Sequence, residues 1–378
     1  MRKHMTTSHD YVQTLKGQKL RFPDLDGLVQ GWPQGLNPNY DAVKKIHHEN
    51  IKGMPELGKR ADSLIKGKFY RHYTFTIPYW ALTSHSRLHI VSFFWPTANF
   101  DELLFMSNLV AWMYIWDDEM DSPEFNDLSR DFQAGEAIRR DTIRYIEASL
   151  DPNGQPEAIS PDSTYLPALL TSFAPVAEAA SSGMTPGQRR LFLNELIHAV
   201  NSTGIEQAAE LSGKIPTIDE YIPLRMGTSA VSVLAVCIEY MAGIDLGDEI
   251  RAQPSIKQIY REVNCTVSLM NDLYSLRREL QHPFYHNANN CSVAVLYHQY
   301  QDLQTAVDKT YELIEATVAR LRATAAEIQM LYPERREDLL AFVAGAQSSI
   351  TGNMAWSLAN KRYDLGISKC DGTAEITI

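Results

Sequence analysis

A chain of 378 residues with 44% apolar side chains is long enough for one large domain or two ordinary ones, with a sizeable buried core. Its formal net charge of -11, with Lys and Arg scattered along the chain, argues against nucleic acid as a partner. Residues 1–10 are polar, and no uninterrupted apolar stretch approaches the ~20 residues of a membrane span. We therefore expect a soluble, cytoplasmic protein without a membrane span.

Helical periodicity dominates the chain. Asn-Gly or Asp-Gly turns between alternating strands, which indicate hairpins, are missing. The first strong helical pattern covers residues 100–116, with Asn99 placed as its N-cap. Similar patterns cover residues 185–209, 218–241, 255–280, 293–330 and 337–363. An all-α fold of about ten helices is therefore predicted.

The predicted organisation is one catalytic domain, residues 69–378, preceded by a partly helical N-terminal strap, residues 1–68. The best candidate for a loop is residues 149–161, most of which reads DPNGQPEAISP. Helical patterns of the same character lie on both sides, so this loop is expected to be internal to the domain.

Four cysteines lie far apart in the sequence, mostly in apolar helical surroundings: Cys237, Cys265, Cys291 and Cys370. Their spacing does not match a metal-binding pattern. We predict buried free thiols, which fit a reducing compartment.

An acidic cluster directly follows the first strong helical pattern. Asp117, Asp118 and Asp121 stand at positions i, i+1 and i+4, which puts Asp117 and Asp121 on one helical face with Asp118 beside them. Carboxylate oxygens suit Mg2+, which takes its remaining ligands from waters and substrate phosphates. The alternative is a solvated acidic end of a helix.

A second set of oxygen donors lies in the string NDLYSLRRE. Asn271, Ser275 and Glu279 fall at i, i+4 and i+8, which is one stripe of an α-helix about two turns long. An amide oxygen, a hydroxyl and a carboxylate on one stripe form a site for a hard cation. Ordinary polar surface is the alternative, but the same helix is otherwise apolar on its inner faces. The two clusters together favour metal binding.

Arginines that suit a diphosphate stand near these clusters, because planar guanidinium groups match its oxygens in pairs. Arg225 lies in YIPLRMGTS, Arg278 precedes the glutamate of the second stripe, and Arg362 with Tyr363 ends the last helical pattern. Each arginine alone fits an ordinary surface charge better than a ligand, and its weight comes from the motif around it.

These four motifs, in this order, resemble those of microbial class I sesquiterpene cyclases, especially the enzymes of filamentous fungi; the match covers residues 93–363. The resemblance implies a single-domain class I terpenoid synthase fold, an all-α helical bundle around a central active-site cavity. It also implies Mg2+ as cofactor, three ions per site, held by Asp117, Asp118, Asp121, Asn271, Ser275 and Glu279. The diphosphate would be bound by Arg225, Arg278, Arg362 and Tyr363. Catalysis would rest on Asp117, Arg225, Asn271, Ser275 and Glu279.

Two positions depart from the family pattern. Arg278 stands where relatives commonly have Lys, which keeps the charge but changes the geometry offered to phosphate. Ser229, preceded by Thr228, stands where many relatives have a glycine whose carbonyl aids ionisation. The role of that carbonyl is therefore left open.

The expected reaction is ionisation of a prenyl diphosphate partner and cyclisation of the cation, with release of diphosphate. Aromatic faces stabilise a moving cation, and Tyr114 and Trp356 lie one and two helical turns from Asp117 and Tyr363. Ordinary core packing is an equal alternative for both rings. Farnesyl diphosphate is favoured over the geranyl and geranylgeranyl compounds by resemblance alone, and the protein is expected to be a monomer or a homodimer.

Three rival functions remain to be weighed. A chain-elongating prenyl diphosphate synthase carries a second aspartate-rich motif where this chain has Asn271, Ser275 and Glu279, so cyclisation is favoured. A protonation-initiated cyclase needs a DxDD motif, and the closest string, at 24–27, reads DLDG. A non-catalytic prenyl-binding protein would have little reason to keep both metal stripes and the arginines.

Overall fold

A computed structural model describes residues 15, 17–52, 90–121, 128–156, 167–281, 291–359, 363 and 365–378, apart from the side chains at 48–52, 118, 121, 167–168 and 279–281. Within these ranges the regular secondary structure is helical except for one short two-stranded sheet, which confirms the predicted all-α class. The long helices are α6 (Phe100–Asp121), α7 (Phe132–Leu150), α10 (Pro186–Ser212), α15 (Pro254–Gln281), α17 (Leu303–Leu331) and α18 (Arg336–Ala359). Shorter elements join them: α8 (Pro167–Thr171), α9 (Ala174–Gly183), α11 (Ile218–Thr228), α12 (Val231–Ala235), α13 (Ile238–Met241), α14 (Gly247–Arg251), α16 (Ser292–Tyr300) and η3 (Pro333–Arg335).

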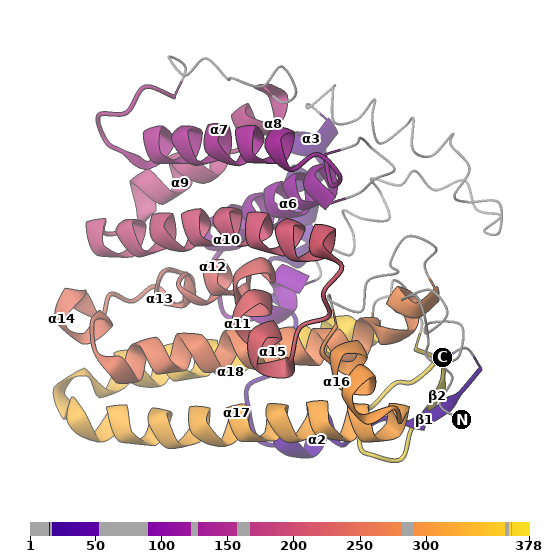
Figure 1. Cartoon of the computed structure of the whole chain (residues 1–378). Coiled ribbons are helices and arrows are strands. Elements are labelled where there is room, and N and C mark those ends of the chain that lie inside the picture. Colours follow the sequence, from indigo (N-terminus) through magenta and orange to yellow (C-terminus); the bar gives the residue numbers. More distant parts are fainter. Residues whose placement is uncertain are drawn as a thin grey trace.

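Helix α15 lies at the centre of the packing. It contacts α11, α12, α16, α17 and α18, and Figure 1 shows the short helices α11 and α12 between α10 and α15. The side chains of Val263, Met270 and Leu273 on α15 are buried in the core. Because α15 is buried on so many sides, polar groups on it are held in fixed positions.

Helix ends follow the expected capping chemistry. The Asn99 side chain accepts a hydrogen bond from the Glu102 amide at 3.0 Å, and Glu102 accepts one from the Asn99 amide at 2.8 Å, which confirms Asn99 as the N-cap of α6. Thr185 and Gln188 form the same capping box at the start of α10. Helix α6 continues past residue 116 to Asp121, so the acidic cluster is helical.

Two of the predicted helical segments are broken. Residues 218–241 form α11, α12 and α13 instead of one helix, and the first break follows Ser229, where Ala230 adopts φ 54°. Residues 293–330 divide between α16 and α17 at Gln301, which has φ 57°. Both left-handed residues are non-glycine, so the sequence lacks the Gly that usually marks such a stop.

The two ends of the described chain meet. Strand β1 (Lys19–Arg21) pairs antiparallel with β2 (Glu375–Thr377), with Leu20 opposite Ile376. Of the helices that follow β1, α2 (Leu25–Leu28) is short, and α3 (Tyr40–Lys52) packs against α6. Helix α7 ends at Leu150, where the loop was expected, and residues 157–161 of that loop lie outside the described residues. The division into a strap and a catalytic domain stays a prediction.

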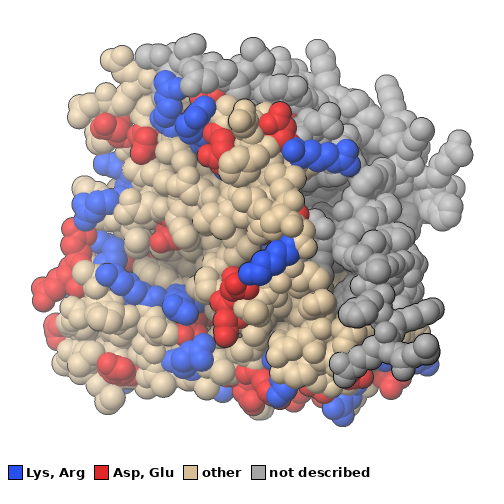
Figure 2. Space-filling view, in the orientation of Figure 1, with Lys and Arg blue, Asp and Glu red and all other residues tan. Residues whose placement is uncertain are grey.

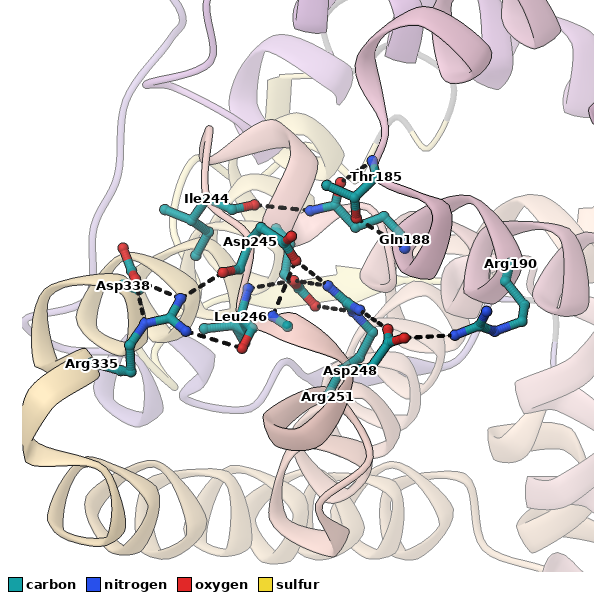
Figure 3. A network of polar contacts seen from close by, with 12 residues as sticks. Thr185, Gln188, Arg190, Ile244, Asp245, Leu246, Asp248, Arg251, Arg335 and Asp338 are labelled. Carbon is teal, nitrogen blue, oxygen red and sulfur yellow. Dashed lines mark hydrogen bonds and ion pairs between the residues drawn. The ribbon is translucent and has the colours of Figure 1, made fainter. Parts of the chain in front are cut away.

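A polar network fixes the end of the bundle around the connection from α13 to α14 (Figure 3). Buried Arg251 donates to both carboxylate oxygens of Glu239, at 3.0 and 2.8 Å. Gln188 at the start of α10 donates to the Ile244 carbonyl at 2.9 Å. Arg335 in η3 donates to the backbone of the same connection at 3.2 Å. The network joins α10 and the start of α18 to this loop, which stabilises the fold.

All four cysteines are buried thiols and not part of a disulfide, as predicted. On the face drawn in Figure 2, the described Lys and Arg side chains are interspersed with Asp and Glu and do not form one broad basic surface. None of the helices in the described part of the chain is both long and apolar enough for a membrane span.

Candidate active site

Helix α6 carries Asp117 on its last turn. Two indoles fix the helix: Trp112 donates to the Leu169 carbonyl at 3.1 Å, and Trp116 donates to the Thr142 hydroxyl at 3.0 Å. The Asp117 side chain is exposed. The same helix continues through positions 118 and 121, whose side chains lie outside the described structure. Their roles as ligands stay predictions.

Helix α11 brings Arg225 to the second stripe. The Arg225 Nε donates to Asp272 Oδ1 at 3.0 Å, and its Nη2 donates to Asn271 Oδ1 at 2.9 Å. The arginine side chain is 18% exposed, whereas the Asp272 side chain is fully buried. Two motifs that are 46 residues apart in the sequence are therefore in direct contact through Arg225 and Asn271.

A third motif reaches the same point. The Asn271 Nδ2 donates to the hydroxyl of Tyr363 at 2.7 Å, across 92 residues of sequence. The Tyr363 ring is buried and packs edge-on against Trp356, with ring centroids 5.5 Å apart and an interplanar angle of 87°. Trp356 therefore supports the tyrosine that contacts the stripe.

The oxygen donors of the second stripe fit a hard cation. Ser275 is buried, and among the described residues its hydroxyl oxygen has no hydrogen-bond partner. This hydroxyl lies four residues after Asn271 on the same face of α15. A Mg2+ ion bound between the two side chains would supply the partner that the hydroxyl oxygen lacks. The described side chains contain no cluster of three His, Cys, Asp or Glu groups able to hold a metal ion. The predicted set relies instead on an amide oxygen, a hydroxyl oxygen and carboxylates. Some of these carboxylates, such as that of Glu279, belong to side chains outside the described structure.

The remaining predicted residues are placed in part. Arg278 lies on α15, one residue before position 279, with a partly buried side chain. Tyr114 lies one turn before Asp117 on α6, also partly buried, whereas Trp356 is only 2% exposed. Arg362 lies outside the described residues.

Asp272 is a site residue that the sequence did not reveal. Its carboxylate accepts hydrogen bonds from the Tyr221 hydroxyl at 2.7 Å, from Arg225 Nε at 3.0 Å and from the Ser292 amide at 3.0 Å. Burial, followed by the Asp272 charge, raises the pKa of Tyr221 well above its ordinary value, so the phenol keeps its proton and donates. Asp272 thus joins α11, α15 and α16 directly behind Asn271.

A second carboxyl on the same side was also missed. Burial first, and then the negative charges of Glu210 and Asp117, raise the pKa of Glu206 on α10 to about 7, although the Arg225 guanidinium opposes the shift. A pKa this close to neutrality marks a carboxyl within an enclosed, electrostatically coupled site. The signal was absent from the sequence because a single Glu on a mixed helix is ordinary.

The break after α11 is held by α15. Asn264 Nδ2 donates to the Met226 carbonyl at 2.7 Å, and the Ser229 hydroxyl donates to Asn264 Oδ1 at 3.0 Å. The Ser229 amide donates to the Arg225 carbonyl at 2.9 Å, which closes the last turn of α11. Ser229, at the position where the family resemblance implies a glycine, therefore joins the end of α11 to α15 through its side chain.

The family comparison agrees with this geometry. A family model described as terpene synthase family 2, C-terminal metal binding, matches residues 108–320, a range that includes Asp117, Arg225 and Asn271. The chain therefore belongs to terpene synthase family 2, and the prediction of a class I terpene cyclase is confirmed.

Individual relatives and structures extend the comparison. The chain is 27% identical to the sesquiterpene cyclase hepA of Aspergillus oryzae, over 96% of this chain and 94% of that protein. It is 24% identical to the terpene cyclase braA of Annulohypoxylon truncatum, over 92% and 86%. The linalool/nerolidol synthase of Streptomyces clavuligerus, in complex with 2-fluorogeranyl diphosphate, superposes with a TM-score of 0.67 at 14% identity, covering 88% of this chain and 98% of that one. Germacradien-4-ol synthase of Streptomyces citricolor gives 0.66 at 17% identity, covering 86% and 96%. These structures show the fold.

Proposed function

We propose that this protein is a Mg2+-dependent cyclase that ionises farnesyl diphosphate and releases a sesquiterpene hydrocarbon or alcohol together with diphosphate. The observation that carries the proposal is the direct contact of Arg225, Asn271 and Tyr363, which come from three separate motifs. A guanidinium, a hard oxygen donor and a phenol at one point form a site for a cation and a diphosphate.

Each group has a separate task in the proposed reaction. Bound Mg2+ would neutralise the charge that develops on the departing diphosphate. On the protein side, Asp117, Asp118, Asp121, Asn271, Ser275 and Glu279 hold the metal, and Arg225, Arg278, Arg362 and Tyr363 hold the diphosphate oxygens. These groups act on the leaving group by charge and not as nucleophiles. The buried apolar helix faces exclude water from the allylic cation, and the rings of Tyr114 and Trp356 offer it π-faces.

Farnesyl diphosphate is preferred because several curated relatives, hepA among them, carry the name sesquiterpene cyclase or synthase. Incubation of the purified protein with Mg2+ and geranyl, farnesyl or geranylgeranyl diphosphate, followed by gas chromatography with mass detection, tests the choice. A cyclic C15 product from the farnesyl compound alone is expected. A longer prenyl diphosphate formed when isopentenyl diphosphate is added would identify a chain-elongating synthase instead.

The metal assignment has its own test. Asp117→Ala and Asn271→Leu should abolish turnover at saturating Mg2+ while leaving the helical circular dichroism unchanged. Asp101→Ala, which removes an exposed carboxylate at the opposite end of α6, is the matched control and should keep near-normal kcat. Near-normal kcat in either site variant would refute the assignment.

A further inference from the structure

Both polar atoms of the Asn271 amide already have protein partners. Its oxygen accepts from Arg225 Nη2 at 2.9 Å, and its nitrogen donates to Tyr363 at 2.7 Å. This oxygen is the one that the metal stripe would offer to a cation. The guanidinium that the diphosphate would need is thus held on the oxygen that the metal would need.

The arginine is anchored at a second point that stays out of reach of a ligand. Arg225 Nε lies 3.0 Å from the buried carboxylate of Asp272, which Tyr221 and the Ser292 amide also contact. Tyr221 and Arg225 come from α11 and Ser292 from α16, so two neighbouring helices fix this carboxylate of α15. The Nε side of the guanidinium is therefore held firmly by Asp272. Its Nη2, in contrast, contacts the Asn271 oxygen, for which a cation would compete.

A divalent cation and a guanidinium repel each other strongly when they share one amide oxygen. Mg2+ binds oxygen at about 2.0–2.1 Å, well inside the distance that separates Nη2 from this oxygen. Because of this repulsion, a cation bound at the Asn271 oxygen favours release of Nη2, whereas the bond between Nε and Asp272 is left intact.

We propose that Arg225 is a metal-released latch: it covers the Asn271 oxygen until a divalent cation binds there, and its freed Nη2 then turns to the diphosphate about the Asp272 anchor. The inference rests on the proposed function and adds an order of events to it. The metal binds at the Asn271 stripe before Arg225 contacts the diphosphate. A prenyl diphosphate that arrives without metal therefore finds Arg225 still hydrogen-bonded to Asn271. Asp272 is a positioning residue, since it acts through Arg225.

The latch predicts opposite effects of one substitution on two ligands. With Mn2+ alone as probe, followed by the paramagnetic resonance signal of free Mn2+, Arg225→Lys should tighten binding about tenfold, because a charge-assisted hydrogen bond to the Asn271 oxygen is lost while the positive charge is kept. With inorganic diphosphate added in the presence of Mn2+, the same variant should bind diphosphate more weakly, because the guanidinium fork is gone. The comparison uses only the Mn2+ binding that Asn271→Leu abolishes, because that part reports on the site at Asn271.

Arg278→Met is the matched control for charge. Arg278 lies on the same helix and is a predicted diphosphate ligand, but it makes no hydrogen bond to Asn271, whose amide contacts are those with Arg225 and Tyr363. If Arg278→Met tightens Mn2+ binding as much as Arg225→Lys, or if Arg225→Lys leaves it unchanged, the latch is refuted while the proposed function survives. Absence of both Mn2+ and diphosphate binding in the wild-type protein would overturn both.

A double-mutant cycle tests the anchor. Asp272→Asn should weaken binding of diphosphate in the presence of Mn2+, and this loss should vanish in the Arg225→Met background, because Asp272 acts through the arginine. If Asp272→Asn does not fold, Tyr221→Phe takes its place in the cycle, because it removes one hydrogen bond of the same carboxylate. An equal loss in both backgrounds would show a merely structural role.

Discussion

The amide nitrogen of Asn271 lies 2.7 Å from the hydroxyl of Tyr363, so the segment after α18 is tied to the middle of α15. The tyrosine ring is held from the other side by Trp356. The position of the Asn271 amide is therefore set both by Arg225 and by a residue near the end of the chain.

Tyr363→Phe should separate the hydrogen bond from the packing of the ring. The phenyl ring keeps the contact with Trp356, and the loss of the bond to Asn271 should lower the free energy of unfolding by about 1 kcal/mol. The KM for the prenyl diphosphate should rise, since the proposed phosphate contact is lost. Urea unfolding and steady-state kinetics measure both effects. The 42% exposed Tyr300 supplies the control. Tyr300→Phe should change the free energy of unfolding by no more than about 0.5 kcal/mol and should leave the KM unchanged.

The buried ion pair of Asp272 and Arg225 should matter far more for folding than an exposed pair. Asp272→Ala leaves the guanidinium and the Tyr221 hydroxyl without their buried acceptor, and we expect a loss of about 3–5 kcal/mol. Glu312→Ala removes an exposed partner of Lys309, 2.7 Å away on α17, and should cost less than about 1 kcal/mol. Equal losses in urea unfolding would show that the Asp272 contacts contribute little.

The periodic segments were readable from the sequence because their physical cause is local. An apolar repeat and a capping residue specify α6, and Asn99 and Glu102 cap each other as expected. The breaks were not readable. Ala230 and Gln301 are ordinary helix residues, so their type does not predict a left-handed conformation. The break at Ala230 lies beside a contact between distant segments, the Asn264 hydrogen bond to the Met226 carbonyl.

The site was readable to the extent that its groups share one helix. Asn271 and Ser275 were found because helical spacing places them on one stripe. Asp272, the next residue, faces about 100° away, and its importance comes from Tyr221 and Arg225 on another helix, a pairing that no local spacing encodes. The role of Asp272 as the anchor of Arg225 therefore depends on contacts between segments that are far apart in the sequence.

The raised pKa of Glu206 predicts a pH dependence of stability. Its ordinary value is 4.5 and its folded value is about 7, so between these pH values the folded protein holds a proton that the unfolded chain has released. This group's contribution to stability is therefore fully present below about pH 4.5 and is lost as the pH rises through 7. Glu206→Gln cannot ionise and should be more stable than the wild type at pH 8, by at most about 3 kcal/mol.

The advantage of Glu206→Gln should disappear near pH 4. Chemical denaturation of both proteins at pH 4, 6 and 8 gives the comparison. Glu315→Gln, whose side chain is exposed on α17, is the control and should change stability by no more than about 0.5 kcal/mol at each pH. A constant difference for Glu206→Gln across the range would contradict the raised pKa.

The two predicted cavity aromatics should respond differently to truncation, because their burial differs. Trp356 is 2% exposed and packs on Tyr363, so Trp356→Leu leaves a cavity and should cost up to about 3–5 kcal/mol of stability. Tyr114 is partly buried one turn from Asp117, and Tyr114→Leu removes a π-face worth about 0.5–2 kcal/mol to a desolvated cation. Ionisation continues in Tyr114→Leu, but more acyclic or monocyclic product should appear. Melting temperature and product ratio are measured together; because both rings are proposed as π-faces, Trp356→Leu should also shift the ratio, and an unchanged ratio in either variant would remove that ring from the cation pocket.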